Sequence, residues 1–165
     1  MKKQGEKYSM PDVLAGLDVW GKAASDYTRT GYYAGIFVDP ANLLEVAKKF
    51  FENDYILEDV SGADFQEGIM VVYHFDRLDQ SGRITVRVLT SHEAPSVPSI
   101  SSIFSGADWH ERECYDFFGV IFEGHPNLKP LLLPDDLGEH PLIKVKDRQS
   151  FYGILPFEQM VVSNS

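Results

Sequence analysis

The amino-acid sequence contains only one cysteine, Cys114, among its 165 residues. A single cysteine excludes an internal disulfide and any metal or iron–sulfur site that needs several cysteines, and it is typical of a reducing, cytoplasm-type compartment. The sequence also has no run of about 18 or more apolar residues, so no segment is predicted to span a bilayer. Basic residues near the start are not followed by an apolar stretch, so no signal peptide is predicted.

Positive charge is scarce as well, with 15 basic residues against 25 acidic ones and a net charge of -10. Nucleic acids and anionic membrane surfaces both select clusters of Lys and Arg, so neither is predicted as a partner. Two interpretations of the acidic excess remain: it serves solubility, or it helps the chain dock onto a basic protein surface. Glycine-rich phosphate loops and nucleotide fingerprints are missing too, so we predict that this chain binds no cofactor and has no metal site.

The apolar content of 44% is sufficient for one domain with a core. Periodicity predicts a helix, a strand, a second helix and then three strands, over residues 9–17, 32–38, 39–51, 55–60, 68–78 and 83–90. In the last strand Ile84, Val86 and Val88 alternate with Thr85 and Arg87, which indicates one buried and one wet face. The pattern predicts an α+β fold in which helices pack on one face of a small antiparallel sheet.

In the last third of the chain the sequence predicts one helix, here called the motif helix, followed by an extended C-terminal arm. Residues 91–105 hold six serines and two prolines, which favours a loop with at most a short helix near 100–104. Beyond Gly119, prolines at positions 126, 130, 134, 141 and 156 exclude a long helix. We therefore divide the chain into an α+β domain at 1–118, which includes the motif helix, and a proline-rich arm at 119–165. The leucines of the arm need a covering surface, supplied either by the chain's own domain or by a partner.

The segment 109–134 is the densest in unusual residues. Asp108 is predicted to cap a helix with Glu111 at capping-box spacing, and Gly119 is predicted to end that helix. Helical geometry places four side chains on one arc: Trp109, Arg112, Glu113 and Asp116. The arginine and the aspartate of this arc are four residues apart and could pair. The arc is either a solvated charged face or an interface anchored by its tryptophan.

A catalytic interpretation of the same segment uses Glu113, Asp116 and His125 as the site of a stand-alone metal-dependent hydrolase. The histidines lack ligand spacing such as His-x-x-x-His, which argues against that alternative. Cys114 has no basic partner and lies toward the apolar side of the helix, so a buried structural thiol is predicted in place of a nucleophile. The residues alone therefore describe a cofactor-free module without a catalytic site, and a free-standing adaptor is a further alternative.

The residues 111–120, ERECYDFFGV, are followed by FEGHP at 122–126. Together they resemble the signature E-R-E-x-x-D-x-x-G-[IV]-x-F-x-G-H-P of the 30-kDa subunit family of proton-pumping NADH:quinone oxidoreductase, respiratory complex I. The same subunit type occurs in related energy-converting complexes. Residues in or beside the motif are candidates for a subunit interface: Trp109, Glu111, Arg112, Glu113, Asp116, Gly119, Phe122, Gly124, His125, Pro126 and Lys129.

The resemblance implies a peripheral-arm subunit that binds no cofactor and scaffolds its neighbours near the quinone site. It implies as partners a large hydrogenase-like subunit of the 49-kDa type and an iron–sulfur small subunit, in a complex with iron–sulfur clusters, and with FMN if it is NADH-linked. The complex would lie on the cytoplasmic, matrix or stromal side of an energy-converting membrane, and the chain would meet that membrane only through the complex. Membrane-bound hydrogenase, formate hydrogenlyase, and F420- or ferredoxin-linked complexes are alternatives.

Two departures from the family pattern indicate a divergent branch. The family usually carries an Arg-Arg pair after the Gly-His-Pro turn, where this chain has Lys129 and Pro130. A later Pro-Leu-Arg-Lys-Asp ending is replaced here by PLIK at 141–144. Any contact that those arginines make in the family is therefore not expected in this chain.

Overall fold

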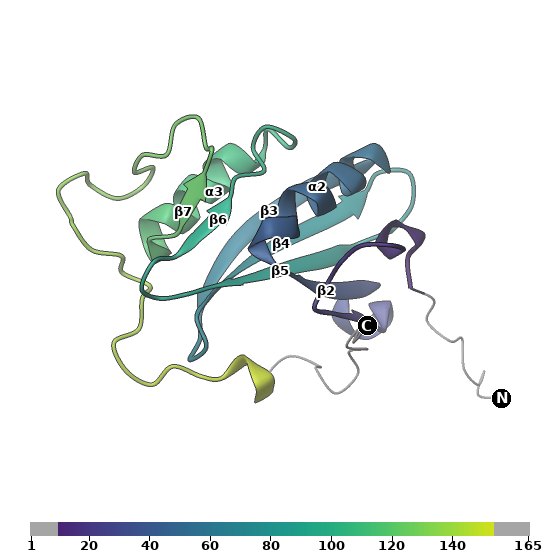
Figure 1. Cartoon of the computed structure of the whole chain (residues 1–165), viewed down its shortest axis with the longest axis horizontal. Coiled ribbons are helices and arrows are strands. Elements are labelled where there is room, and N and C mark those ends of the chain that lie inside the picture. Colours follow the sequence, from purple (N-terminus) through teal and green to yellow (C-terminus); the bar gives the residue numbers. More distant parts are fainter. Residues whose placement is uncertain (1–9, 154–165) are drawn as a thin grey trace.

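The structure is a computed structural model that describes residues 10–153 (Figure 1). Five strands form the main sheet: β1 (Gly21–Ala24), β2 (Ala34–Val38), β3 (Tyr55–Asp64), β4 (Ile69–Arg77) and β5 (Ile84–Thr90). Two short strands pair with each other, β6 (Ser96–Pro98) and β7 (Ile121–Glu123). The α-helices are α1 (Tyr27–Thr30), α2 (Leu43–Glu52) and α3 (Ala107–Phe118). The short 3-10 helices are η1 (Asp12–Leu14), η2 (Pro40–Asn42) and η3 (Phe151–Gly153).

The main sheet has the strand order β1-β2-β5-β4-β3. The α+β class is confirmed, but the prediction of an antiparallel sheet is wrong at one pair, because β2 and β5 are parallel. The reason is the path of the chain. After β2 it crosses through α2 to the far edge of the sheet, and the β3–β4–β5 meander then brings β5 back beside β2 in the same direction.

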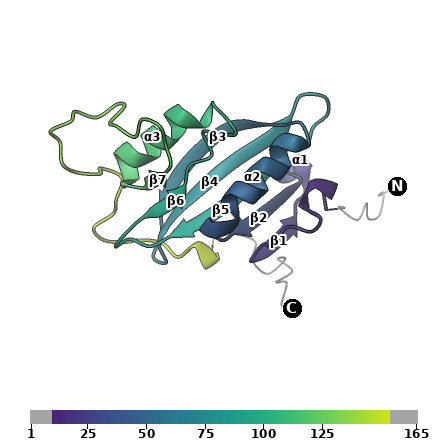
Figure 2. The same ribbon diagram turned by 45° about the horizontal axis from the view of Figure 1, so that its top comes forward.

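Helix α2 lies across one face of the sheet (Figure 2). The chain enters α2 through η2, and the start of η2 follows from the sequence, because the Asp39 carboxylate accepts a hydrogen bond of 2.8 Å from the Ala41 amide and Pro40 occupies its first turn. The residues of α2 that are buried against the sheet are Leu43, Val46, Ala47 and Phe50. Phe51, which the periodicity placed in the same stripe, is 57% exposed. The apolar stripe is therefore narrower than predicted.

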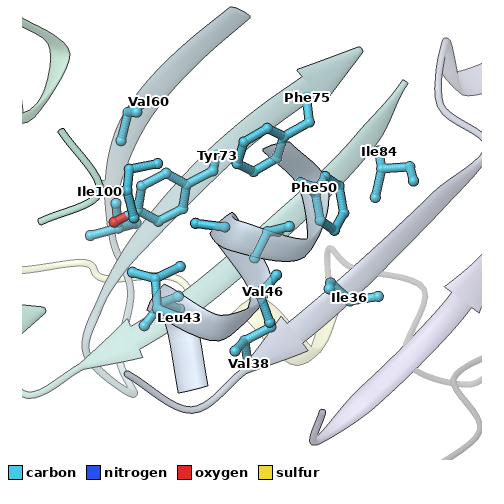
Figure 3. Packing of buried hydrophobic residues seen from close by; sticks show 14 of the residues in the cluster. Ile36, Val38, Leu43, Val46, Phe50, Val60, Tyr73, Phe75, Ile84 and Ile100 are labelled. Atoms are coloured by element: carbon cyan, nitrogen blue, oxygen red, sulfur yellow. The ribbon is translucent and has the colours of Figure 1, made fainter. Parts of the chain in front are cut away.

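The hydrophobic core fills the space between α2 and the inner face of the sheet (Figure 3). The rings of Phe50 and Phe75 are 4.7 Å apart between centroids, and Phe75 also contacts Phe104 at 5.2 Å. Ile100 and Val120 join this core from outside the main sheet. The core therefore fixes both the loop that precedes α3 and the turn that follows it.

Helix α3 packs beside the edge strand β3, where Gly62 allows a close approach. A Cβ atom at position 62 would lie 2.5 Å from Cδ2 of Phe118, so a larger residue would push the helix away. Across residues 10–153, no helix combines the length and the apolar character needed to cross a membrane. Ser9, in the first predicted helix, and residues 154–165, in the predicted arm, lie outside the described residues.

Several short elements were not predicted. Strand β6 lies in the segment predicted as a loop, and the predicted short helix there is a single turn in which Ile103 and Phe104 donate to the Ile100 carbonyl. β1 and β7 were missed as well, since strands of three or four residues have no periodicity to detect. The first predicted helix is reduced to η1. The division of the chain into residues 1–118 and 119–165 stays a prediction.

Candidate functional site: a helix that holds an arm

Helix α3 begins one residue before the position predicted for its cap. Gly106 is the N-cap residue, so the prediction that Asp108 caps the helix is wrong. The predicted end is correct, because Gly119 adopts a left-handed conformation with φ of 71° and its amide donates to the Tyr115 carbonyl over 2.9 Å. The predicted capping-box partner, Glu111, is used for a different contact.

The side chain of Glu111 is buried and binds the loop between β6 and α3. Its two carboxylate oxygens accept hydrogen bonds from the Ser99 hydroxyl at 2.5 Å and the Ile100 amide at 2.8 Å. Burial raises the pKa of Glu111 to about 7, against the opposing effect of these two hydrogen bonds. The buried hydroxyl of Tyr73 has no hydrogen-bond partner among the described residues, and burial together with the charge of Glu111 keeps its pKa high. Glu111 thus holds the loop that leads into α3.

The Gly-His-Pro turn is tied to the first turn of the same helix through His125, whose side chain is buried. Its Nδ1 accepts from the Asn127 amide at 3.0 Å, so its Nε2 carries the proton and donates to the Asp108 carbonyl at 3.1 Å. Gly124 supplies the turn with a left-handed backbone, φ 83°. Pro126 at the turn is exposed, and Phe122 is buried in the core.

The arm, defined here as residues 124–153, is held by α3 through Arg112 and Asp116. Arg112 donates to the carbonyls of Lys129 at 3.1 Å and Pro130 at 2.9 Å. One oxygen of Asp116 accepts from three consecutive backbone amides, at 2.9, 2.7 and 3.2 Å: Leu131, Leu132 and Leu133. The prediction that Arg112 and Asp116 pair is therefore wrong. Each binds the arm instead, one through carbonyls and the other through amides.

The arm also satisfies the end of α3. The last carbonyl groups of a helix have no partner within it. His140 Nδ1 hydrogen-bonds with the Asp116 carbonyl at 2.8 Å, and the Leu142 amide donates to the Phe117 carbonyl at 3.1 Å. Gly119 is needed here for a second reason, because a Cβ atom at that position would lie 2.6 Å from the His140 ring. The motif residues therefore hold the arm against α3: Arg112 and Asp116 bind it, and Gly119 leaves space for it.

A second anchor, which the sequence reasoning missed, lies at the end of β3. The carboxylate of Asp64 has a buried side chain and accepts hydrogen bonds from the Lys144 amide at 2.7 Å and from Arg148 Nε at 3.0 Å. Burial alone would raise the pKa of Asp64, but the Lys144 amide, His92 and Arg148 outweigh it and lower the pKa. Further along the arm, the Ser150 hydroxyl donates a hydrogen bond to the Glu67 carboxylate. Figure 1 shows the arm looping out beyond α3 and running on to η3.

Residues 36–151, which include α3, the Gly-His-Pro turn and most of the described arm, match the protein family described as respiratory-chain NADH dehydrogenase, 30 Kd subunit. The chain belongs to this family. The 30-kDa subunit resemblance drawn from the motif is confirmed over a far longer stretch than the motif itself.

Relatives in the 30-kDa subunit family carry the names of two kinds of complex. The C subunit of NADH-quinone oxidoreductase from Roseiflexus castenholzii is 38% identical over 144 residues, covering 82% of this chain and 76% of that protein. Its counterpart in Chloroherpeton thalassium is 45% identical over 98 residues, covering 58% and 41%. The C subunit of F(420)H(2) dehydrogenase from Methanosarcina mazei is 40% identical over 88 residues, covering 52% and 56%. The chain thus spans about half the length of the latter two.

Two solved structures share the fold of this 30-kDa family chain. The trypsin-resistant fragment of Nqo5 aligns with a TM-score of 0.53 and 30% identity, covering 58% of this chain and 82% of the fragment. A chain of the membrane-bound sulfane sulfur reductase, an archaeal respiratory membrane complex, aligns with a TM-score of 0.63 and covers 74% of each chain. At 22% identity the second likeness shows the fold alone. The α+β class of this chain is shared with the Nqo5 fragment.

The exposed side chains around α3 in this 30-kDa family chain are not all those that the sequence placed on the charged face of the helix. Glu111 and Asp116 are buried and have partners inside the chain, whereas Trp109 is 67% exposed and Glu113 and Lys129 are also exposed. The arm is fixed largely through backbone groups and through the side chains of His140 and Arg148, and several of its apolar side chains still face outward. The exposed ones are Leu132, Leu137, Leu142 and Val145. The chain's own domain thus holds the arm without covering it completely.

The metal-dependent hydrolase alternative gains no support from the site. Glu113 is exposed, Asp116 is occupied by the arm, and His125 is held by Asn127 and Asp108. Within residues 10–153 no three side chains capable of binding a metal ion come together.

Cys114 of this 30-kDa family chain is a buried thiol, as predicted, and its Sγ lies 3.7 Å from the Val60 carbonyl. Burial, helped by the charges of Glu113 and Asp59, raises its pKa. We therefore expect iodoacetamide at pH 8 to label the native chain at least about 100-fold more slowly than the urea-unfolded chain. Mass spectrometry of timed samples measures both rates, and equal rates would contradict the assignment.

Proposed function

We propose that this chain is a cofactor-free, peripheral-arm subunit of a membrane-associated, ion-translocating complex of the NADH:quinone oxidoreductase type. In this proposal it scaffolds the large hydrogenase-like subunit and the iron–sulfur small subunit near the quinone site, and catalysis belongs to those neighbours. The observation that carries the proposal is membership of the 30-kDa subunit family over residues 36–151. Iron–sulfur clusters, and FMN if the complex is NADH-linked, are assigned to other subunits.

The arrangement of the motif supports a scaffolding role. Motif side chains hold the arm backbone in place, which leaves Trp109, Glu113, Lys129 and the outward leucines of the arm free to meet a neighbour. A binding element that is ordered in advance loses less conformational entropy when it docks. We propose that these outward residues form the contact with the neighbouring subunits, on the cytoplasmic, matrix or stromal side of the membrane.

The test is purification of the tagged chain from the cell that produces it, with identification of the subunits that accompany it. We expect a large hydrogenase-like subunit and an iron–sulfur small subunit in amounts equal to that of the chain. The purified chain alone should neither oxidise NADH nor reduce quinone. Recovery without those subunits, or turnover by the isolated chain at the rate of a whole complex, would refute the proposal.

A second candidate is the equivalent subunit of a related complex, such as an F420- or ferredoxin-linked dehydrogenase, a membrane-bound hydrogenase or a formate hydrogenlyase. The 40% identity to the C subunit of an F(420)H(2) dehydrogenase favours keeping it. The same purification separates the two candidates. NADH-binding flavin subunits would indicate the first, and a nickel-ligating large subunit or an F420-binding subunit the second.

Trp109 offers a direct test of the proposed contact. Large aromatic side chains at the centre of an interface commonly contribute 2 kcal/mol or more to binding, roughly a 30-fold effect. We expect Trp109→Ala to lower the amount of assembled complex about 30-fold on a native gel, and to change the free energy of unfolding of the isolated chain by no more than about 0.5 kcal/mol. Trp20→Ala removes a tryptophan that is 51% exposed elsewhere, so it is the matched control. Equal effects of the two variants would exclude Trp109 from the contact.

A further inference from the structure

The buried carboxyl group of Glu111 is connected to the surface by two serine hydroxyl groups. Glu111 itself is 0% exposed, and its Oε2 lies 2.5 Å from the Ser99 hydroxyl oxygen. Ser99 is buried as well, and its hydroxyl oxygen lies 2.8 Å from that of Ser101, a partly exposed residue. Both distances are those of O–H···O hydrogen bonds. The three side chains therefore form one continuous hydrogen-bonded path from the interior to a residue that meets solvent.

The hydroxyl groups of this path can donate in either direction, because a hydroxyl has one donor and two acceptor positions and its hydrogen rotates to suit its partners. When Glu111 is ionised, the Ser99 hydroxyl donates to Oε2 and accepts from the Ser101 hydroxyl. When Glu111 is protonated, its own O–H donates to Ser99, and Ser99 donates to Ser101. The Ser101 amide also donates to the Ser99 hydroxyl oxygen, at 3.2 Å. Both arrangements thus use the one donor and both acceptor positions of Ser99.

The other titratable groups near Glu111 on α3 and the Gly-His-Pro turn do not hold it in one charge state. The charge of Asp108 opposes its ionisation, and Cys114 keeps its own proton because burial raises the pKa of the thiol. His125 Nε2 lies 3.9 Å from Oε2 but donates to the Asp108 carbonyl. No lysine or arginine of residues 10–153 forms an ion pair with Glu111. Burial, the largest effect, raises the pKa of Glu111 to about 7, so this carboxyl group gains and loses its proton near neutral pH.

Tyr73 on β4 contributes a buried donor to the same region. Its hydroxyl is fully buried and has no hydrogen-bond partner among residues 10–153, and burial together with the charge of Glu111 raises its pKa. In Figure 3 this hydroxyl points toward Ile100, whose amide binds Glu111. A buried donor without a partner is unfavourable, and a carboxylate that accepts its hydrogen bond removes that penalty. Tyr73 therefore favours the ionised form of Glu111, whereas burial favours the protonated form.

We propose that Glu111 is a proton-binding site that exchanges its proton with solvent through Ser99 and Ser101. On release, the proton of Oε2 passes to the Ser99 oxygen, the former Ser99 proton passes to Ser101, and the former Ser101 proton passes to water. Uptake reverses the three transfers. Each serine ends with the hydroxyl it began with, and Glu111 alone changes its charge. The site goes beyond the proposed function, because a scaffold needs no exchangeable proton, and all of its groups belong to this chain.

The variants Ser101→Val and Ser101→Thr test the path in the full chain, since the two new side chains have nearly the same shape and only threonine keeps a hydroxyl. Time-resolved infrared spectroscopy follows the carbonyl band of protonated Glu111, identified by its loss in Glu111→Gln, after a light-triggered drop in pH. A positioned proton-transfer group commonly accelerates transfer about 100-fold or more. We therefore expect the band to appear about 100-fold more slowly in Ser101→Val than in the wild type, and at the wild-type rate in Ser101→Thr.

The pH midpoint of the same band separates a path from a structural role. Ser101→Val and Ser101→Thr should have equal midpoints, because a path changes the rate of exchange and not the affinity for the proton. Tyr73→Phe should raise the midpoint, since the ionised carboxylate loses a donor. Ser102→Val, at an exposed neighbouring position, should change neither quantity. Equal rates in the two Ser101 variants, or midpoints that differ between them, would overturn the path, and a wild-type band that is constant between pH 5 and pH 8 would overturn the site. None of these results involves a neighbouring subunit, so the proposed function is tested separately.

Discussion

Asp116→Ala is expected to release the arm from α3. One carboxylate oxygen of Asp116 accepts from three consecutive amides, and a hydrogen bond to a charged acceptor contributes about 1.5–3 kcal/mol. The freed amides can bind water, so we expect a local loss of about 3 kcal/mol and not the sum of three bonds. Hydrogen exchange at Leu131, Leu132 and Leu133 should then accelerate about 100-fold, measured by NMR or mass spectrometry.

The matched control is Glu113→Ala, which removes an exposed carboxylate from the same helix and should leave exchange in the arm unchanged. In the assembled complex, Asp116→Ala should also reduce assembly, because the arm must then be ordered at the moment of docking. Wild-type protection of the three leucine amides in Asp116→Ala would show that the arm is held by other contacts, such as those to Asp64.

The contacts of the motif residues explain what these residues do in the fold, which their charges alone do not explain. Arg112 and Asp116 bind carbonyls and amides of the arm, and His140 and Leu142 of the arm complete the end of the helix. Residues 129–133 are held through backbone groups, which leaves the Leu132 side chain exposed. Further along the arm, His140 and Arg148 are held through their side chains. Arg112 binds the carbonyls of Lys129 and Pro130, so these two hydrogen bonds do not use the side chains of those residues.

Local signals were sufficient to predict part of this architecture. Asp39 and Pro40 start a helix, alternation identifies β4 and β5, and Gly119 ends α3. The motif also indicated the family. These features depend on neighbours within about one turn or one strand pair, which periodicity and capping rules describe.

The remaining features depend on contacts that no local rule describes. Asp64 binds residues 80 and 84 positions later in the chain, and nothing in its own neighbourhood indicates that partner. The motif made Glu111 a candidate for a subunit interface, but the loop at Ser99 and Ile100 supplies a buried binding position for it. A helical spacing of four predicted a pair between Arg112 and Asp116, and the tertiary partners of both residues outcompete it.

Glu111→Gln is expected to remove a large part of the pH dependence of stability. Burial raises the pKa of Glu111 from 4.5 to about 7 in the folded chain. Between these values the folded state keeps a proton that the unfolded state releases, so the free energy of unfolding falls as the pH rises. The stabilisation is complete below pH 4.5 and is lost as the pH passes about 7. A shift of this size corresponds to about 3 kcal/mol.

Urea unfolding at pH 5 and at pH 8 measures this difference. Glutamine reproduces the protonated acid, since its oxygen can accept from the Ile100 amide while its NH₂ donates to the Ser99 hydroxyl. The wild-type chain should therefore lose about 3 kcal/mol more than Glu111→Gln between the two pH values. Glu113→Gln, at an exposed position of the same helix, should retain the wild-type difference and controls for the change in net charge. If Glu111→Gln shows the same loss as the wild type, Glu111 is ionised in the folded chain throughout this range, and its buried position is maintained by the Ser99 and Ile100 hydrogen bonds alone.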